Sequence, residues 1–421
     1  MIFLSRVSDP STPTLLPDRI EPRGTRVRTI VLVAFVLRLA VIFLGHTYRI
    51  NPRNDFQNFG FEMGRVARSL ATGQGFSSPF DLPTGPTALV PPLYPGLLAA
   101  IFKIFGVYSR AAAIAILSLD SLFSALICAV LYRIGKRVFD RRVARWTAWT
   151  WALFPYAIYW PVRMVWETSL SALLLSLAIL QTLRCDIDES ARQWIWMGLL
   201  WGAMALTNPA LLAIAPVTLI WLALEGSLPW RRAALAAAIA AAMIVPWTVR
   251  NYRAFHRFIL VRDNFWLELH LSNNPLSDGF WTRSEHPGND PRAMLRFQQM
   301  GEIAYIDAMR DQVNIFVHRH TAKFLGWTYK RVFFFWLGEP KEEVVGGWEF
   351  DFAKHAGFGL WTAIAFAGLW LMSRRQAYAA GLFAGILALY PVAYYLTRAS
   401  PRYRHPIEPL LLLLTIYAIA A

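Results

Sequence analysis

The sequence predicts an all-α polytopic membrane protein with about ten transmembrane helices, and three observations lead to this fold class. Of its 421 residues, 56% are hydrophobic and only 16% are charged, whereas a soluble domain is about 25% charged. Several stretches approach the roughly 20 apolar residues that a helix needs to cross the hydrocarbon core. Basic residues cluster between these stretches, as they do in the loops that orient membrane proteins.

The predicted spans are apolar stretches bounded by charges or prolines. In chain order they cover residues 29–45, 111–132, 146–160, 165–183, 194–206, 211–224, 233–249, 355–372, 377–396 and 407–421. Residues 321–338 would be an eleventh span, but three basic residues favour an amphipathic helix lying on the membrane. Residues 90–105 begin with three prolines in six positions and are expected to be interfacial or re-entrant.

The distribution of basic residues predicts the orientation. Arg28 precedes the first span, and the loop 133–145 holds six basic residues against one acid. The positive-inside rule places both in the cytoplasm, so we expect a cytoplasmic N-terminus in a plasma (inner) membrane. The chain then divides into a cytoplasmic tail (1–28), a transmembrane core (29–248) with an outer loop (46–110), an outer juxtamembrane segment (249–354) and C-terminal transmembrane helices (355–421).

The net charge of +15 could indicate nucleic acid or an anionic membrane as the partner. Part of this charge lies on the expected cytoplasmic side, where it sets the orientation. The rest breaks the positive-inside rule at the outer face, which favours a phosphate-bearing lipid and argues against nucleic acid. The two cysteines, Cys128 and Cys185, form neither a disulfide framework nor a metal-ligand pattern. No metal site or cofactor is predicted, and participation of a divalent cation stays open.

Two carboxylates near the start of the first outer loop are candidates for catalysis. Asp55 follows the first span by about ten residues, and Glu62 lies seven residues further on. On one helix the two side chains would share a face. A carboxylate at the membrane boundary can act as a general base towards a hydroxyl. The alternative is that Asp55 caps the helix that follows.

Two outer clusters of basic residues are candidates for binding an anion. The first contains Arg250 and Arg253 in a stretch without acids, and the second contains Arg402, Tyr403 and Arg404. The fork of a guanidinium group suits bidentate contact with phosphate. Pairing with bulk lipid headgroups at the interface would explain the same arginines. Both interpretations remain at this stage.

Three short motifs, in this order and topological placement, resemble those of a known family. The first comprises Asp55 with residues 67–76 and 91–95, the second is 246–252, and the third is 401–406. On these motifs the chain resembles polytopic type-C glycosyltransferases of the protein-O-mannosyltransferase-like group, which includes the bacterial aminoarabinose transferases.

This resemblance implies an inverting transfer of one sugar from a polyprenyl-phosphate donor to an acceptor at the outer membrane face. Asp55 matches the catalytic acid position, where it would deprotonate or orient the acceptor hydroxyl, and Glu62 is the second catalytic candidate. The arginines and Tyr403 of the second and third motifs would receive the lipid phosphate. Further candidates for contact with substrate are Tyr94, Glu167 and His405. A departure from the family pattern is Asn208, where a basic residue is expected.

The resemblance leaves the sugar open, and the acceptor could be a lipid, a glycan or a protein. A lipid or solute transporter, such as a flippase that guides anionic headgroups with the basic clusters, is the alternative function. A flippase needs polar groups through its full depth, whereas this sequence concentrates them at the outer rim. The third alternative is a membrane scaffold, in which Asp55 only caps a helix and the arginines only set the topology.

Overall fold

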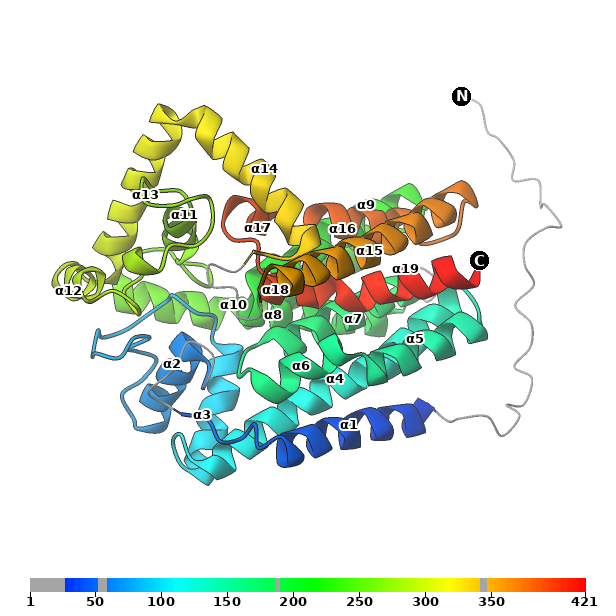
Figure 1. Ribbon diagram of the computed structural model, residues 1–421, viewed down its shortest axis with the longest axis horizontal. Helices are drawn as coiled ribbons and strands as arrows, with labels where there is room; N and C mark the ends of the chain where they lie inside the picture. Colours follow the sequence, from blue (N-terminus) through cyan, green and yellow to red (C-terminus); the bar gives the residue numbers. More distant parts are fainter. Residues whose placement is uncertain (1–26, 52–58, 186–189, 341–346) are drawn as a thin grey trace.

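The computed structural model describes residues 27–51, 59–185, 190–340 and 347–421, in which the regular structure is helical apart from an isolated β-bridge between Ser77 and Pro86. The long helices run side by side, whereas α2, α3 and α11–α13 gather at one end of the bundle (Figure 1). The predicted fold class, an all-α polytopic membrane protein, is confirmed.

The helices of the first half are α1 (Val27–Leu44), α2 (Phe61–Ala71), α3 (Leu93–Phe105), α4 (Arg110–Val138), α5 (Arg141–Leu153), α6 (Pro155–Arg163), α7 (Thr168–Cys185), α8 (Ala191–Thr207), η1 (Pro209–Ala213) and α9 (Ile214–Leu224). The second half forms α10 (Trp230–Phe255), α11 (Phe265–Ser272), η2 (Arg283–Glu285), α12 (Pro291–Met300), α13 (Glu302–Arg319), α14 (Thr321–Leu337), α15 (Gly347–Arg374), α16 (Ala380–Leu389), α17 (Val392–Leu396), α18 (Pro401–Arg404), η3 (His405–Ile407) and α19 (Glu408–Ala420).

Five of the described helices are long and apolar enough to cross a membrane, namely α1, α4, α7, α10 and residues Lys354–Arg374 of α15. The other predicted spans correspond to shorter or interrupted helices. The predicted span 146–160 is divided between α5 and α6 at Pro155, and 377–396 is divided between α16 and α17 at Pro391. Proline has no backbone N–H and therefore interrupts the helical hydrogen-bond ladder.

The break between α5 and α6 is bridged by Arg38, a fully buried residue in the middle of α1. Its guanidinium donates hydrogen bonds to the backbone oxygens of Trp151 (3.3 Å) and Ala157 (3.3 Å). In a continuous helix these oxygens would accept from the residues four positions later, which here are Pro155 and Pro161. Arg38 therefore supplies the donors that the two prolines lack.

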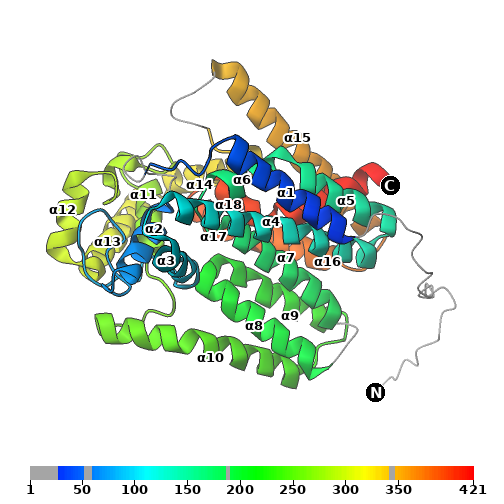
Figure 2. The same ribbon diagram turned by 90° about the horizontal axis from the view of Figure 1, so that it is seen from below.

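Helices α8 and α10 lie side by side, in a layer on one side of α7 (Figure 2). Glycines on α8 allow this close approach. A Cβ atom at Gly198 would lie 2.5 Å from the backbone oxygen of Ala236, and one at Gly202 would lie 2.5 Å from the sulfur of Met243. Larger residues at either position would push α10 away from α8.

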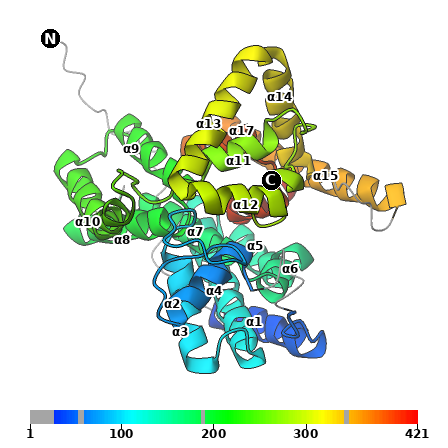
Figure 3. The ribbon, with the colours of Figure 1, turned by 90° about the vertical axis from the view of Figure 1, so that its left-hand side faces the viewer.

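Helices α11–α13 lie at the same end of the bundle as α2 and α3, and α14 leads from α13 back to the long helices (Figures 1 and 3). The predicted amphipathic helix 321–338 forms α14, and Arg331 anchors it. The buried guanidinium donates to the backbone oxygens of Tyr395 (2.7 Å) and Gly279 (3.0 Å) and to the side chain of Asn273 (3.1 Å). Arg331 thus joins α14 to α17 and to the loop after α11.

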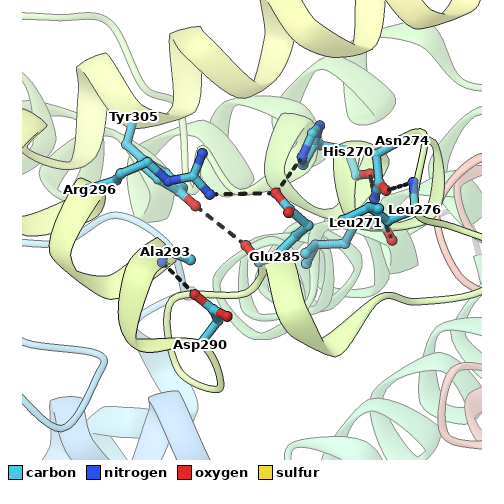
Figure 4. Close-up of polar contacts among 9 residues, drawn as sticks. All are labelled: His270, Leu271, Asn274, Leu276, Glu285, Asp290, Ala293, Arg296 and Tyr305. Carbon is cyan, nitrogen blue, oxygen red and sulfur yellow. Dashed lines mark hydrogen bonds and ion pairs between the residues drawn. The ribbon is translucent and has the colours of Figure 1, made fainter.

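Within this segment, Glu285 joins α11, α12 and α13 (Figure 4). One carboxylate oxygen lies 3.5 Å from Nε2 of His270 and 3.6 Å from the guanidinium of Arg296. The backbone oxygen of the same residue accepts a hydrogen bond from the Tyr305 hydroxyl (3.4 Å). Asp290 caps α12 by accepting from the N–H of Ala293 (2.8 Å). These contacts give the segment a polar framework of its own.

Two buried carboxyl groups lie where the outer segment meets the first outer loop. The N–H of Ala88 donates to Glu302, and the backbone oxygen of Ala88 accepts from the N–H of Asp263 (3.1 Å). Burial raises the pKa of Glu302 well above its ordinary value, and the neighbouring Asp263 adds to the shift. Burial likewise raises the pKa of Asp263, to about 6.

We expect Arg38→Met to lower the free energy of unfolding by about 3 kcal/mol, because buried carbonyl groups lose their donors. Thermal unfolding in detergent micelles measures the effect, with the exposed Arg163→Met as the control. In a Pro155→Ala background, residue 155 regains an N–H for Trp151, so the loss caused by Arg38→Met should shrink by about 1 kcal/mol. Equal losses in both backgrounds would contradict this explanation of the helix break.

We expect Asp263→Asn to stabilise the protein at pH 7.5 relative to the parent, and to have little effect at pH 4. An acid whose pKa is raised on folding holds more protons in the folded state, so its contribution to stability falls as the pH rises from about 4 to about 6. The amide introduced by Asp263→Asn does not titrate, so the variant does not lose stability over this pH range. Unfolding curves recorded between pH 4 and pH 8 would test it, and a parallel decline for parent and variant would refute it.

Candidate functional site

A group of charged and phenolic residues from four separate segments meets where the transmembrane helices end. Arg402 interacts electrostatically with Glu62, Glu167 and Glu268, and Arg262 interacts with Glu167. We call the group the polar cluster. Its members are Glu62 and Arg65 of α2, Glu167 before α7, Arg262 and Glu268 around α11, His286, Tyr394 of α17, and Arg402 and Tyr403 of α18.

The start of α2 places Glu62 in the polar cluster. Gly60 precedes the helix with a φ of 82°, a left-handed conformation that favours glycine. A Cβ atom at this position would lie 2.7 Å from the backbone oxygen of Val165, two residues before Glu167. The close approach therefore sets the loop before α7 directly against the N-terminus of α2.

This geometry corrects the expectation of one helix carrying both Asp55 and Glu62. Helix α2 begins at Phe61, and its N-cap residue is Gly60, which has no side chain to cap it. Asp55 itself lies outside the described residues. The sequence could not indicate this because the interruption depends on the packing of Gly60 against Val165.

His286 holds the carboxylate of Glu62. Its Nε2 atom lies 3.2 Å from Oε1 of Glu62, and its Nδ1 atom accepts a hydrogen bond from the N–H of Gly288 (3.0 Å). Because Nδ1 is an acceptor, the neutral ring carries its proton on Nε2 and donates it to Glu62. Phe80 packs edge-on against the ring at 5.6 Å, which fixes its plane.

The pKa of Glu62 reflects two opposing causes. Burial alone would raise the pKa, because it disfavours the charged form. The hydrogen bond from His286, assisted by the charges of Arg402 and Arg65, outweighs burial and brings the pKa below its ordinary value. Glu62 is therefore a carboxylate at neutral pH.

Arg402 lies over the indole ring of Trp166 with its guanidinium carbon 4.0 Å from the ring centroid. It donates a hydrogen bond to the hydroxyl of Tyr403 (2.7 Å). Among the described residues, neither Arg402 nor Arg262 forms an ion pair within 4.0 Å. By contrast, Arg65 pairs with Asp81 at 2.8 Å. Two guanidinium groups of the polar cluster are thus left for an anion.

Glu167 is buried at the start of α7, with a relative exposure of 7%. Within the described part of the chain, its Oε2 atom has no hydrogen-bond partner. Arg163, four residues before Glu167, is exposed on α6, and the two form no ion pair within 4.0 Å. A buried carboxyl oxygen without a partner is costly, and such groups concentrate at functional sites.

Two of the predicted phosphate-binding arginines have other partners. Arg250 donates to the backbone oxygens of Phe76 (2.6 Å) and Thr87 (2.7 Å), and so holds the first outer loop against α10. Arg404 is fully buried and pairs with Glu408, four residues later. Arg253 is exposed on α10. Of the four predicted arginines, the structure thus brings only Arg402 to the polar cluster.

The remaining predicted substrate contacts lie deeper in the protein. Tyr94 is buried and donates its hydroxyl proton to Asp120 at 2.8 Å. His405 is fully buried among aromatic rings, with Trp160 at 5.6 Å and Trp151 at 5.7 Å between centroids. Neither ring nitrogen of His405 has a hydrogen-bond partner among the described residues.

Sequence reasoning missed His286, Arg65 and Glu268 as members of the polar cluster. Each stands alone in a long outer segment or loop, and only the fold brings it to Glu62 or Arg402. In the sequence, Arg262 is the fourth arginine of the stretch that begins at Arg250, and its neighbouring acid is Asp263. In the described part of the chain, no three His, Cys, Asp or Glu residues are grouped so that they could hold a metal ion.

Comparison with known proteins identifies the architecture. Residues 89–249 match the family of dolichyl-phosphate-mannose-protein mannosyltransferases. The oligosaccharyltransferase AglB of the archaeon Archaeoglobus fulgidus, solved with an inhibitory peptide and a dolichol-phosphate, superimposes with a TM-score of 0.54 at 14% identity. The match covers 94% of this chain and 50% of AglB. The chain has the fold of a type-C glycosyltransferase.

The predicted resemblance to this family is thereby confirmed. A second AglB structure, tethered to an acceptor peptide, gives a TM-score of 0.55 at 14% identity and covers 94% of this chain and 49% of that one. The chain thus spans about half the length of AglB. ArnT of Cupriavidus metallidurans was solved with undecaprenyl phosphate. It gives a TM-score of only 0.40 at 14% identity, over 93% of this chain and 77% of that one. No curated protein sequence matches the chain.

We expect His286→Phe to raise the pKa of Glu62, because burial then acts without the opposing hydrogen bond. His286→Gln, whose amide can still donate to the carboxylate, should raise it less. Infrared titration of the carboxyl band, assigned with Glu62→Gln, measures the shift, and the exposed His318→Phe is the control. An unchanged pKa in His286→Phe would show that His286 does not control Glu62.

Proposed function

We propose that this chain is a membrane glycosyltransferase that moves one sugar from a polyprenyl-phosphate donor to an acceptor hydroxyl at the outer membrane face. The observation that carries the proposal is the polar cluster. In it, a carboxylate held by His286 lies in the electrostatic field of Arg402, a guanidinium that forms no ion pair within 4.0 Å among the described residues. The family match and the type-C fold supply the reaction class, and AglB was solved with a dolichol-phosphate.

The phosphate of the donor is proposed to lie between Arg402, Arg262 and the hydroxyl of Tyr403. Two arginines can offer paired N–H donors to phosphate oxygens. The indole of Trp166 supports Arg402 from one side, so the N–H groups of the guanidinium are already ordered before the phosphate binds. This assignment keeps Arg402 and Tyr403 from the sequence and replaces Arg250, Arg253 and Arg404 with Arg262.

Asp55 is proposed as the catalytic base. The buried Phe59 is four positions later in the chain, so the Cα of Asp55 lies within about 15 Å of the Phe59 Cα. It takes the proton of the acceptor hydroxyl as that oxygen forms a bond to the anomeric carbon. The bond from the anomeric carbon to the phosphate oxygen breaks, and the electron pair leaves with the lipid phosphate. Attack opposite the leaving group inverts the anomeric centre.

Glu62 and Glu167 are proposed to orient the substrates. The Glu62 carboxylate, fixed by His286, accepts a hydrogen bond from a sugar or acceptor hydroxyl. The unpartnered Oε2 of Glu167 offers a second acceptor nearby. As the phosphate leaves, Arg402 and Arg262 stabilise its growing negative charge, which is the role that fixed cations fulfil in group transfer. The N-terminus lies in the cytoplasm and the site faces the opposite side.

The test is transfer of radiolabelled sugar from a polyprenyl-phosphate donor to a membrane extract by the purified protein. We expect Asp55→Asn to abolish transfer, and Arg402→Gln to raise the KM for the donor about tenfold or more, as for a lost charged hydrogen bond. The exposed Arg292→Gln of α12 is the matched control and should behave as the parent. Lipid scrambling by the purified protein without sugar transfer would replace this proposal with the flippase alternative.

A further inference from the structure

A groove runs between α1 and α4 at the end of the bundle away from the polar cluster. Its volume is about 840 Å³. The walls are apolar and consist of Val31, Leu32 and Phe35 of α1 with Leu122, Leu126 and Ala129 of α4. The two helices lie along the same edge of the bundle (Figure 1). Such an apolar groove on the flank of a membrane helix faces lipid.

Two arginines lie together at one end of this groove. Arg28 comes from the first turn of α1 and Arg133 from the last turns of α4, and both are exposed. Among the described residues, neither is within ion-pair distance of an acid. Arg133 and Arg137 also repel the nearby Arg184 electrostatically. An anion at this position would relieve that repulsion.

The dimensions of the groove suit the acyl chain of one leaflet. From Arg28 to Phe35 the groove follows α1 for about 11 Å, at roughly 1.5 Å per residue. Half of a bilayer hydrocarbon core of about 30 Å is about 15 Å. The arginines lie at the end that a headgroup would occupy, and the apolar walls extend from them towards the bilayer centre.

We propose that this groove binds an anionic phospholipid of the cytoplasmic leaflet, with its phosphate on Arg28 and Arg133 and an acyl chain along the apolar walls. The site is separate from the polar cluster and does not depend on the transfer reaction. Bulk headgroups around any membrane protein exchange freely, whereas a groove with two arginines at its end retains one lipid.

Native mass spectrometry of the purified protein, titrated with phosphatidylglycerol or phosphatidylcholine, tests this site. We expect one phosphatidylglycerol to bind first and to bind more tightly than phosphatidylcholine. Arg28→Gln combined with Arg133→Gln should weaken that first binding about 20- to 30-fold, if each arginine contributes about 1 kcal/mol. Arg142→Gln combined with Arg145→Gln removes the same charge from exposed positions on the neighbouring α5 and should leave it unchanged.

A second variant separates the groove from general electrostatics. Ala129→Trp fills the apolar wall without changing the charge, and it should also displace the first phosphatidylglycerol. Circular dichroism would establish that each variant keeps its helices. Equal weakening by the α5 pair, or no effect of Ala129→Trp, would overturn the site. Tighter binding of a polyprenyl phosphate than of phosphatidylglycerol would overturn the assigned occupant. None of these measurements involves sugar transfer, so a result that overturns the lipid site would not affect the proposed function.

Discussion

The interior of this protein depends on finding donors for backbone carbonyl groups where proline interrupts a helix. In an apolar surrounding, an unpaired carbonyl has no water to bond with, so each interruption must be satisfied from within the fold. Arg38 does this for the break between α5 and α6, and its role explains how a charged residue is tolerated in the middle of the first span. At the C-terminal end of α14, Arg404 and Thr362 likewise donate to the backbone oxygen of Trp336.

Helix interruptions also create the polar cluster. Glu167 lies in the short connection between α6 and α7, and Arg402 lies in the single turn of α18 between α17 and η3. Neither position belongs to a long helix, so each side chain can turn towards the outer segment instead of the lipid. Positioning chemistry on the connections between rigid helices is a common solution.

The sequence was sufficient to predict the fold class and some members of the polar cluster. There are physical reasons why the other members could not be predicted. Apolar length and charge asymmetry identify a membrane protein because they act through composition alone. Glu62, Glu167 and Arg402 were selected from the sequence, and the structure brings them to the polar cluster. Arg250 and Arg404 carry the same local signal, yet their guanidinium groups serve backbone oxygens and a carboxylate. Whether an arginine meets a ligand or a carbonyl is decided by contacts between distant segments, which local sequence does not reveal.

The contact between Gly60 and the backbone of Val165 has a mechanical consequence. It brings the start of α2 against the loop before α7, so the backbone that carries Glu62 lies directly beside the backbone that carries Glu167. Arg402 packs over Trp166 in the same loop. A side chain larger than hydrogen at position 60 would push this loop away from α2, and it would separate Glu62 from Glu167 and Arg402 together.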